Sequence, residues 1–309
     1  MEIIVGKTAG FCYGVKNAVD KTKESVQKQK ETYCLGELVH NKQVTQSLEE
    51  QGLIIINNVE EAKNNVIIRS HGVPKEVYER AEELDLKVID LTCPNVLKIH
   101  NIVKEYSSKN YYIFIIGQKD HAETIGTVSY CRKNSTILEK QEDVEKAIKN
   151  FKESNLKKLL IVSQTTFSVE KFNKIVKDVE ENIDKNTVFE VKNTICNATN
   201  IRQKETQEIA KQVDLMIIIG GKHSSNTTKL YEIAKQVDLM IIIGGKHSSN
   251  TNKLYQIAKK ECNKCLLIET AEELDKDYII KSEKIGIMAG ASTPKESIES
   301  TVEKIKKMC

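Results

Sequence analysis

Residues 87–108 read KVIDLTCPNVLKIHNIVKEYSS, and this stretch contains the unit that recurs along the whole chain. Residues 87–91 are typical of a short buried strand, and residues 96–108 alternate apolar and polar side chains at helical spacing. Pro94 stands where the helix is expected to begin, a position at which its missing N–H costs nothing. Cys93 falls between the two segments. The stretch therefore predicts a strand, a helix and a thiol at the junction between them.

Strand-like and helix-like segments alternate in this way from one end of the chain to the other. Apolar strands joined by helical crossovers form parallel sheets covered on both faces, so the predicted fold class is α/β. The 309 residues are enough for about two or three domains. No stretch rich in glycine and serine marks a boundary, so the domains are expected to lie close together.

The composition argues against several classes of partner. Lysine and arginine number 47 against 44 acidic residues, and there is no tryptophan, so no nucleic-acid partner is expected. The apolar runs are far shorter than the roughly 18 residues that a membrane span needs, so no membrane association is expected. Glu2 follows Met1 directly, and no apolar signal region comes after it. We therefore expect a cytoplasmic protein.

One block of sequence occurs twice in succession. Residues 208–231 and residues 232–255 are identical except that Thr228 in the first copy corresponds to Asn252 in the second. A solenoid needs about three repeats, so the two copies indicate a duplication of one helix–strand–loop unit inside a complete domain.

Three of the eight cysteines share one position in the pattern. Cys12, Cys93 and Cys196 each follow a predicted strand and precede a predicted helix, and helix N-termini lower the pKa of a thiol. A chain of this size without a signal peptide is not expected to carry a disulfide framework. The pair Cys262 and Cys265 lacks the second pair of a four-ligand zinc site, so we interpret it as structural.

Other polar side chains also follow predicted strands, where parallel sheets bind their ligands. The histidines indicate a cationic pocket for an anion, whereas His100 lies in the middle of a predicted helix and is interpreted as a core residue. Serine, threonine and asparagine at helix starts either cap the helix or bind phosphate, because both roles use the N-terminal amides. The residues at these positions are His40, His71, His121, Glu123, Thr165, Ser224, Ser225, Asn226, Ser248, Ser249, Asn250 and Ser292.

Residue types alone leave more than one function open. Three thiolates leave an iron–sulfur cluster one protein ligand short, and the open iron could bind a substrate oxygen as a Lewis acid. The same thiolates could hold zinc with an open position, which would fit a hydrolase. An iron–sulfur electron carrier is the third alternative, but it usually needs four cysteines and gives Glu123 no role.

Several short motifs occur along the chain, which in chain order are GFCYGV, ELVHN, RSHGV, DLTCP, GQKDHAE, SQTT, ICNAT, SSNT and AGAST. They resemble the motifs of the LytB family, the 4-hydroxy-3-methylbut-2-enyl diphosphate reductases, and the resemblance covers essentially the whole chain outside the duplicated block. The resemblance implies a trefoil of three small α/β modules, with mainly parallel sheets, around a central [4Fe-4S] cluster. We assign the modules to residues 1–95, 96–194 and 195–309, the third carrying the duplicated block 208–255.

The resemblance also implies a role for each candidate residue. Cys12, Cys93 and Cys196 would hold the cluster. Glu123 would donate a proton, with Thr165 and His121 beside it in the catalytic group. The substrate would be bound by His40, His71, His121, Thr165, Ser224, Ser225, Asn226 and Ser292, with Ser248, Ser249 and Asn250 as the alternatives from the second copy. We expect only one serine–serine–asparagine loop to bind, favour the first copy, and expect the surplus unit to keep its local structure outside the cleft.

The implied reaction is a reductive dehydroxylation of a small allylic diphosphate. 4-Hydroxy-3-methylbut-2-enyl diphosphate would yield isopentenyl diphosphate and dimethylallyl diphosphate, the last step of the non-mevalonate isoprenoid pathway. Two electrons would come from a donor such as ferredoxin or flavodoxin, and Glu123 would protonate the departing hydroxyl group.

Overall fold

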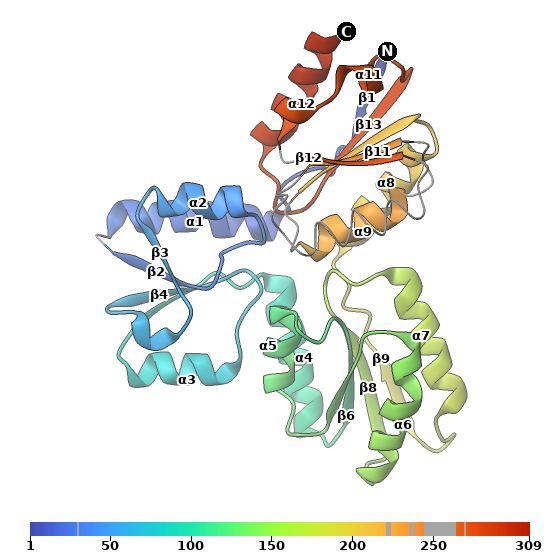
Figure 1. The fold of residues 1–309 in the computed structure, drawn as a ribbon. Coiled ribbons are helices and arrows are strands. Elements are labelled where there is room, and N and C mark those ends of the chain that lie inside the picture. The colour runs from blue at the N-terminus through green and yellow to red at the C-terminus, as the bar shows by residue number, and fades with distance from the viewer. Residues whose placement is uncertain (30, 221–223, 235–236, 238, 244–263, 269) are drawn as a thin grey trace. The chain divides into compact units, whose positions relative to one another are not determined.

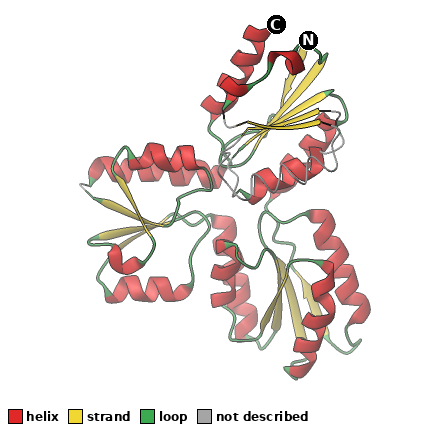
Figure 2. Cartoon of the chain, in the orientation of Figure 1, coloured by secondary structure: helices red, strands yellow, loops and turns green. Residues whose placement is uncertain are grey.

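The structure is a computed structural model that describes residues 1–309 except 30, 221–223, 235–236, 238, 244–263 and 269. Its paired strands are all parallel and form three sheets, with helices packed against them (Figure 2). The α/β class with mainly parallel sheets, expected from the sequence, is confirmed. None of the helices in the described part of the chain combines the length and the apolar character needed to cross a membrane.

The chain divides into two compact units. The first unit contains residues 1–16, 39–47 and 197–309, and the second unit contains residues 17–38 and 48–196. Two helices contribute residues to both units, namely α1 (Tyr13–Lys28) and α2 (Lys42–Glu49).

The first unit is built on a five-stranded sheet in the order β1-β13-β10-β11-β12 (Figure 1). Its elements are β1 (Glu2–Val5), α8 (Asn197–Ala210), β10 (Leu215–Ile219), α9 (Ser225–Ala234), β11 (Leu239–Ile243), β12 (Lys264–Ile268), the 3-10 helix η3 (Ala271–Glu273), α11 (Lys276–Ile279), β13 (Lys284–Ala289) and α12 (Lys295–Met308). Alternate residues of β10 face opposite layers. Met216 and Ile218 pack with α8 and α9, whereas Ile217 and Ile219 pack with α11 and α12. The sheet is therefore buried on both faces.

The second unit contains two four-stranded sheets, in the orders β3-β2-β4-β5 and β7-β6-β8-β9. The elements of the first of these sheets are β2 (Thr32–Leu35), β3 (Leu53–Ile56), the 3-10 helix η1 (Val59–Glu61), β4 (Asn65–Ile68), α3 (Lys75–Glu83) and β5 (Lys87–Asp90). Those of the other are α4 (Pro94–Ser108), β6 (Tyr112–Ile116), α5 (Ala122–Ser129), β7 (Ser135–Leu138), the 3-10 helix η2 (Gln141–Asp143), α6 (Val144–Glu153), β8 (Lys158–Ser163), α7 (Val169–Asn182) and β9 (Val188–Val191).

Helices cover both faces of the sheet around β6 in the same way, and alternate residues of β6 face opposite layers. Phe114 and Ile116 pack with α6 and α7, and Ile113 and Ile115 pack with α4. Because both faces are apolar, these strands read as continuous hydrophobic runs, as parallel strands covered by helices do.

The first strand differs from the module boundaries expected from the sequence. β1 was assigned to the module of residues 1–95, but it pairs in parallel with β13, so it belongs to the sheet made by the C-terminal segment. Parallel strands that pair are separated by a long connection in the chain, so local sequence patterns do not reveal which strands are neighbours. The bounds 1–95, 96–194 and 195–309, and the trefoil arrangement of the modules around a cluster, stay predictions.

The strand of the second copy is inserted inside the sheet of the first unit. β11 pairs in parallel with β10, and Leu215 to Ile219 lie opposite Leu239 to Ile243 in order. On its other side β11 pairs with β12, so the extra strand is not at an edge. Residues at the same position in the two copies lie opposite each other, so Met240 packs in the same layer as Met216, and Ile241 in the same layer as Ile217. The surplus strand keeps its structure, as expected, but within the sheet. Ser248, Ser249 and Asn250 lie outside the described residues.

Deletion of residues 232–255 is expected to leave a folded protein. β12 can then pair directly with β10, and the sheet returns to four strands, as in the other two sheets. Circular dichroism should show a cooperative thermal transition for the deletion variant. As a control, deletion of residues 158–181 removes β8, which has no copy, and should abolish that transition. Loss of the transition in the 232–255 deletion would show that the second copy has become essential to folding.

Candidate functional site

Each of the three cysteines singled out in the sequence directly precedes a helix in the structure. Cys12 precedes α1, Cys93 is the N-cap residue of α4, and Cys196 precedes α8. All three are partly exposed thiols. By contrast, burial raises the pKa of Cys34 and of Cys131 to about 12, so these two thiols stay protonated. Cys262 and the side chain of Cys265 lie outside the described residues.

In the second unit, Glu123 and Thr165 form a buried pair. Glu123 lies in the first turn of α5 and is 2% exposed. The backbone N–H of Thr165 donates to Oε1 of Glu123 at 2.6 Å, and the Thr165 hydroxyl donates to Oε2 at 2.7 Å. Burial raises the pKa of Glu123 to about 7, and the two hydrogen bonds from Thr165 oppose that rise. The carboxyl group can therefore hold a proton near neutral pH.

His121 caps the helix on which Glu123 lies. Its Nδ1 accepts the backbone N–H of Glu123 at 3.2 Å, so the ring proton of the neutral form lies on Nε2. Burial, and then the charge of Arg69, lower the pKa of His121 to about 4. Burial and the nearby guanidinium disfavour a charge on His121, whereas the sequence predicts a cationic pocket here. The His71 ring lies 5.6 Å from the His121 ring, edge to face.

Backbone and side-chain contacts connect this pair of histidines and the carboxyl group to two of the cysteines. The N–H of Cys196 donates to the carbonyl oxygen of Thr165 at 2.8 Å, and the N–H of Cys93 donates to that of Ser70 at 3.0 Å. Nδ2 of Asn95 donates to the sulfur of Cys196 at 3.2 Å. The second unit therefore brings together six predicted site residues, namely His71, Cys93, His121, Glu123, Thr165 and Cys196.

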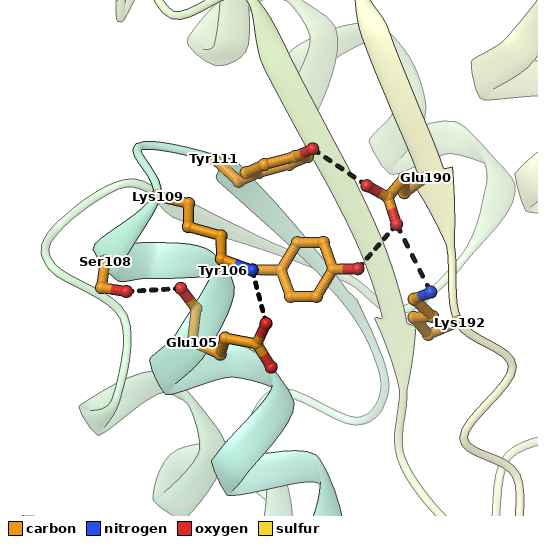
Figure 3. A network of polar contacts seen from close by, with 7 residues as sticks. All are labelled: Glu105, Tyr106, Ser108, Lys109, Tyr111, Glu190 and Lys192. Carbon is orange, nitrogen blue, oxygen red and sulfur yellow. Dashed lines mark hydrogen bonds and ion pairs between the residues drawn. The ribbon is translucent and has the colours of Figure 1, made fainter.

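A polar network links helix α4 to strand β9 (Figure 3). The hydroxyls of Tyr106 and Tyr111 donate to the two carboxylate oxygens of Glu190, at 2.6 and 2.9 Å. Tyr106 lies on α4, which begins after Cys93, and Glu190 lies on β9, which leads toward Cys196. Hydrogen bonds from the tyrosines lower the pKa of Glu190, so it stays ionised and keeps this link at neutral pH.

The first unit brings together a second group of predicted residues. The Ser292 hydroxyl donates to the carbonyl oxygen of His40 at 3.2 Å, and Nδ2 of Asn41 donates to that of Ser292 at 2.7 Å. The N–H of Cys12 donates to the carbonyl oxygen of Ala291 at 3.3 Å. The loop that contains Ser292 therefore lies against both the His40 segment and the Cys12 segment.

Arg202 was not predicted from the sequence, yet it joins this group. It is 3% exposed and donates to the carbonyl oxygens of Thr8 and Gly10 and to Oδ1 of Asn226. Nδ2 of Asn226 donates in turn to the hydroxyl of Thr199 at 3.3 Å. Arg202 lies within a helix, not after a strand, so the rule used to find candidates could not select it. Asn95 and Arg69 were also missed.

The thiol groups fit a metal centre by their chemistry. Within the described ranges, no three histidine, cysteine, aspartate or glutamate side chains are grouped as metal ligands. Cys12 belongs to the first unit, and Cys93 and Cys196 belong to the second. Partly exposed thiols at helix N-termini, one of them accepting an N–H from Asn95, suit soft metal ions or iron–sulfur groups. The roles of these residues stay predictions.

The chain is similar to one family along nearly its whole length. The family model described as LytB protein matches residues 3–237 and residues 232–306, and the second match begins where the second copy begins. A 4-hydroxy-3-methylbut-2-enyl diphosphate reductase of Clostridioides difficile is 39% identical, with 98% of each chain covered. The enzyme of the same name from Aquifex aeolicus is 37% identical, with 100% of this chain and 97% of that protein covered.

Two solved structures are also similar. The E-1-hydroxy-2-methyl-but-2-enyl-4-diphosphate reductase of Plasmodium falciparum matches with a TM-score of 0.77 and 28% identity, over 98% of this chain and 87% of that one. A structure titled (E)-4-hydroxy-3-methyl-but-2-enyl diphosphate reductase, the terminal enzyme of the non-mevalonate pathway, matches with a TM-score of 0.67 and 36% identity. It covers 99% of this chain and 100% of that one.

The pKa of Glu123 predicts how folding stability depends on pH. Its folded value is raised from 4.5 to about 7, so its stabilising contribution is present below pH 4.5 and is lost as the pH rises through 7. Relative to a Glu123→Gln variant, the free energy of unfolding of the unmodified protein should fall by about 3 kcal/mol over this range. Urea denaturation at a series of pH values measures the difference.

The comparison isolates Glu123 because the glutamine variant keeps His121, which titrates nearby. Glu145→Gln serves as the matched control, since Glu145 is an exposed carboxylate in the first turn of α6. Parallel curves for the unmodified protein and Glu123→Gln would show that the pKa of Glu123 is not raised.

Proposed function

Since the chain belongs to the LytB protein family, we propose that it reduces 4-hydroxy-3-methylbut-2-enyl diphosphate to isopentenyl diphosphate and dimethylallyl diphosphate. This would be the terminal step of the non-mevalonate isoprenoid pathway. In this chain the proposal rests on the buried pair of Glu123 and Thr165. The carboxyl group of Glu123 can hold a proton near pH 7, and the carbonyl oxygen of Thr165 accepts the N–H of Cys196.

Cys12, Cys93 and Cys196 would hold the iron–sulfur cluster of this family, which we propose to be of the [4Fe-4S] type. When bound, such a cluster supplies electrons and an iron without a protein ligand that can act as a Lewis acid. Each of the three thiols lies directly before a helix and is partly exposed, so it is accessible to a metal centre. The N–H donated by Asn95 supports negative charge on the sulfur of Cys196.

Glu123 is the proposed proton donor for the departing hydroxyl group. Its Oε1 accepts the backbone N–H of Thr165, so in the protonated form the proton lies on Oε2. The Thr165 hydroxyl beside Oε2 can rotate to accept that proton or return its own. A carboxyl group whose pKa is near the working pH is suited to general acid catalysis. The C–O bond then breaks and the hydroxyl group leaves as water, while two electrons and a second proton, taken up at carbon, complete either product.

Neutral donors are proposed to bind the diphosphate. Ser224–Asn226 stand at the beginning of α9, and the N-terminal end of a helix favours phosphate oxygens. Ser292, His40, His71 and His121 complete the proposed set. His121 offers an Nε2–H in its neutral form, which suits an acceptor oxygen of the substrate without adding a charge.

The remaining partner is an electron donor, because the reaction consumes two electrons. We propose a small redox protein such as ferredoxin or flavodoxin, and a cytoplasmic location for the reaction. The substrate is small and anionic, and binding it needs neither a membrane nor a nucleic acid.

Glu123→Gln tests the acid role. The amide keeps the shape of the side chain but has no proton to give, so turnover should fall about 100-fold to 10,000-fold. Turnover is measured anaerobically with the named substrate and a chemical reductant, and substrate affinity and iron content should change little. Glu145→Gln is the control and should behave as the unmodified enzyme. Near-normal turnover of Glu123→Gln would exclude this role.

Cysteine-to-serine variants test the proposed cluster ligands. Replacement of Cys12, Cys93 or Cys196 should lower the iron and sulfide bound per chain after anaerobic purification, because each removes a thiolate ligand. Replacement of Cys131 or Cys309 should leave both unchanged. Zinc in place of iron, or an equal loss in the Cys131 variant, would contradict the assignment.

A further inference from the structure

The duplicated block repeats the serine–serine–asparagine loop but not the residues that hold it. The block begins at residue 208, so each copy contains its own loop. Thr199 and Arg202 lie earlier on α8 and occur once. Both contact Asn226 of the first copy. The chain therefore contains two candidate loops and a single set of supporting side chains.

The contacts of Arg202 use three of its nitrogen atoms on two segments of the first unit. Nε donates to the carbonyl oxygen of Thr8 at 2.8 Å, and Nη2 donates to that of Gly10 at 2.8 Å. Nη1 donates to Oδ1 of Asn226 at 3.1 Å. A guanidinium group is planar and presents its N–H groups in a fixed fork, so one side chain sets the spacing between these segments.

These contacts determine which end of the Asn226 amide faces which neighbour. Oδ1 accepts from Arg202, and Nδ2 donates to Thr199. Nδ2 carries two hydrogens and Thr199 takes one, so the other is a donor that an anion can accept. Without Arg202 the amide could reverse and present its oxygen, which repels a phosphate oxygen.

The other end of Arg202 supports the segment before Cys12. Gly10 has a positive φ of 98°, and a Cβ added there would lie 3.3 Å from the carbonyl oxygen of Thr293, so the backbone passes close to the Ser292 loop. Glu205, one turn further along α8, accepts the N–H groups of Lys7 and Thr8 at 2.7 and 2.9 Å. Helix α8 therefore contacts residues 7–10 in two ways: Arg202 donates to their carbonyl oxygens, and Glu205 accepts their backbone N–H groups.

The strand of the second copy, β11, occupies a different position in the sheet. β10 lies between β13 and β11, so the second copy starts its loop from a strand about 4.8 Å further from β13. Gly290, which follows β13, donates its N–H to the carbonyl oxygen of Ile219 in β10 at 2.8 Å. The strand of the first copy is therefore the one beside the Ser292 loop.

We propose that Arg202 is a positioning residue that selects the first copy as the diphosphate-binding loop by fixing the Asn226 amide beside the Cys12 segment. This rests on the proposed function. Arg202 acts through Asn226 and does not itself contact the substrate. Its single occurrence makes Ser224–Asn226 the working loop and leaves the second copy without a binding role.

The test measures KM and kcat anaerobically, per bound cluster, for Arg202→Gln, Asn226→Ala, the double variant and Asn250→Ala. Arg202→Gln and Asn226→Ala should each raise KM about tenfold, the loss expected for one charge-assisted hydrogen bond. The double variant should be no worse than the poorer single variant, because both changes remove the same donor. Asn250→Ala should keep the KM of the unmodified enzyme, as should Arg80→Gln, a control at an exposed ion pair.

Several outcomes would overturn the proposal. They are an unchanged KM for Arg202→Gln, multiplying effects in the double variant, or a KM for Asn250→Ala as high as that for Asn226→Ala. If Arg202→Gln does not fold, Arg202→Lys keeps the charge but not the fork and should still raise KM. An unmodified enzyme that binds its cluster but does not turn over the substrate would count against the proposed function, and not against the role of Arg202.

Discussion

Parallel strands place their carboxyl ends at one edge of a sheet, and the candidate site of this protein depends on that constraint. In each sheet the chain leaves a strand at this edge and turns into a helix, whose first amides have no partner within the helix. Cys93 and Cys196 lie at such turns in the second unit, and Cys12 lies at one in the first. Within the second unit, Asn95 and Cys196 are far apart in sequence, yet they are in contact there without any local signal that they will be.

Burial then determines the chemistry of the residues that meet. Glu123 and His121 are neighbours at the start of one helix, yet burial raises the pKa of Glu123 and lowers the pKa of His121. Both shifts favour the neutral form, because a charge loses its hydration when it is buried. The acid therefore keeps a proton and the histidine keeps a donor N–H, a combination suited to delivering a proton next to an anionic substrate.

The duplicated block shows how much a parallel sheet tolerates. A second copy of β10 has the same apolar alternation, so it can pair beside the original and face the same helix layers. The hydrophobic pattern is satisfied by either copy. The first copy also receives polar support from outside the block, because Thr199 and Arg202 make hydrogen bonds to Asn226.

The local sequence pattern was enough to predict the α/β class and the strand-to-helix position of each of the three cysteines. It also selected the candidate carboxyl, histidine and hydroxyl groups. These features follow from periodicity and helix starts, which neighbouring residues encode. Only the tertiary structure showed the pairing of β1 with β13 and the place of β11 inside the sheet. The burial that lowers the pKa of His121 and the hydrogen bonds of Arg202 also appeared only there. Strand partners, desolvation and long-range hydrogen bonds depend on residues that are distant in the chain. Composition and spacing do not contain that information, and the packing of the folded chain supplies it.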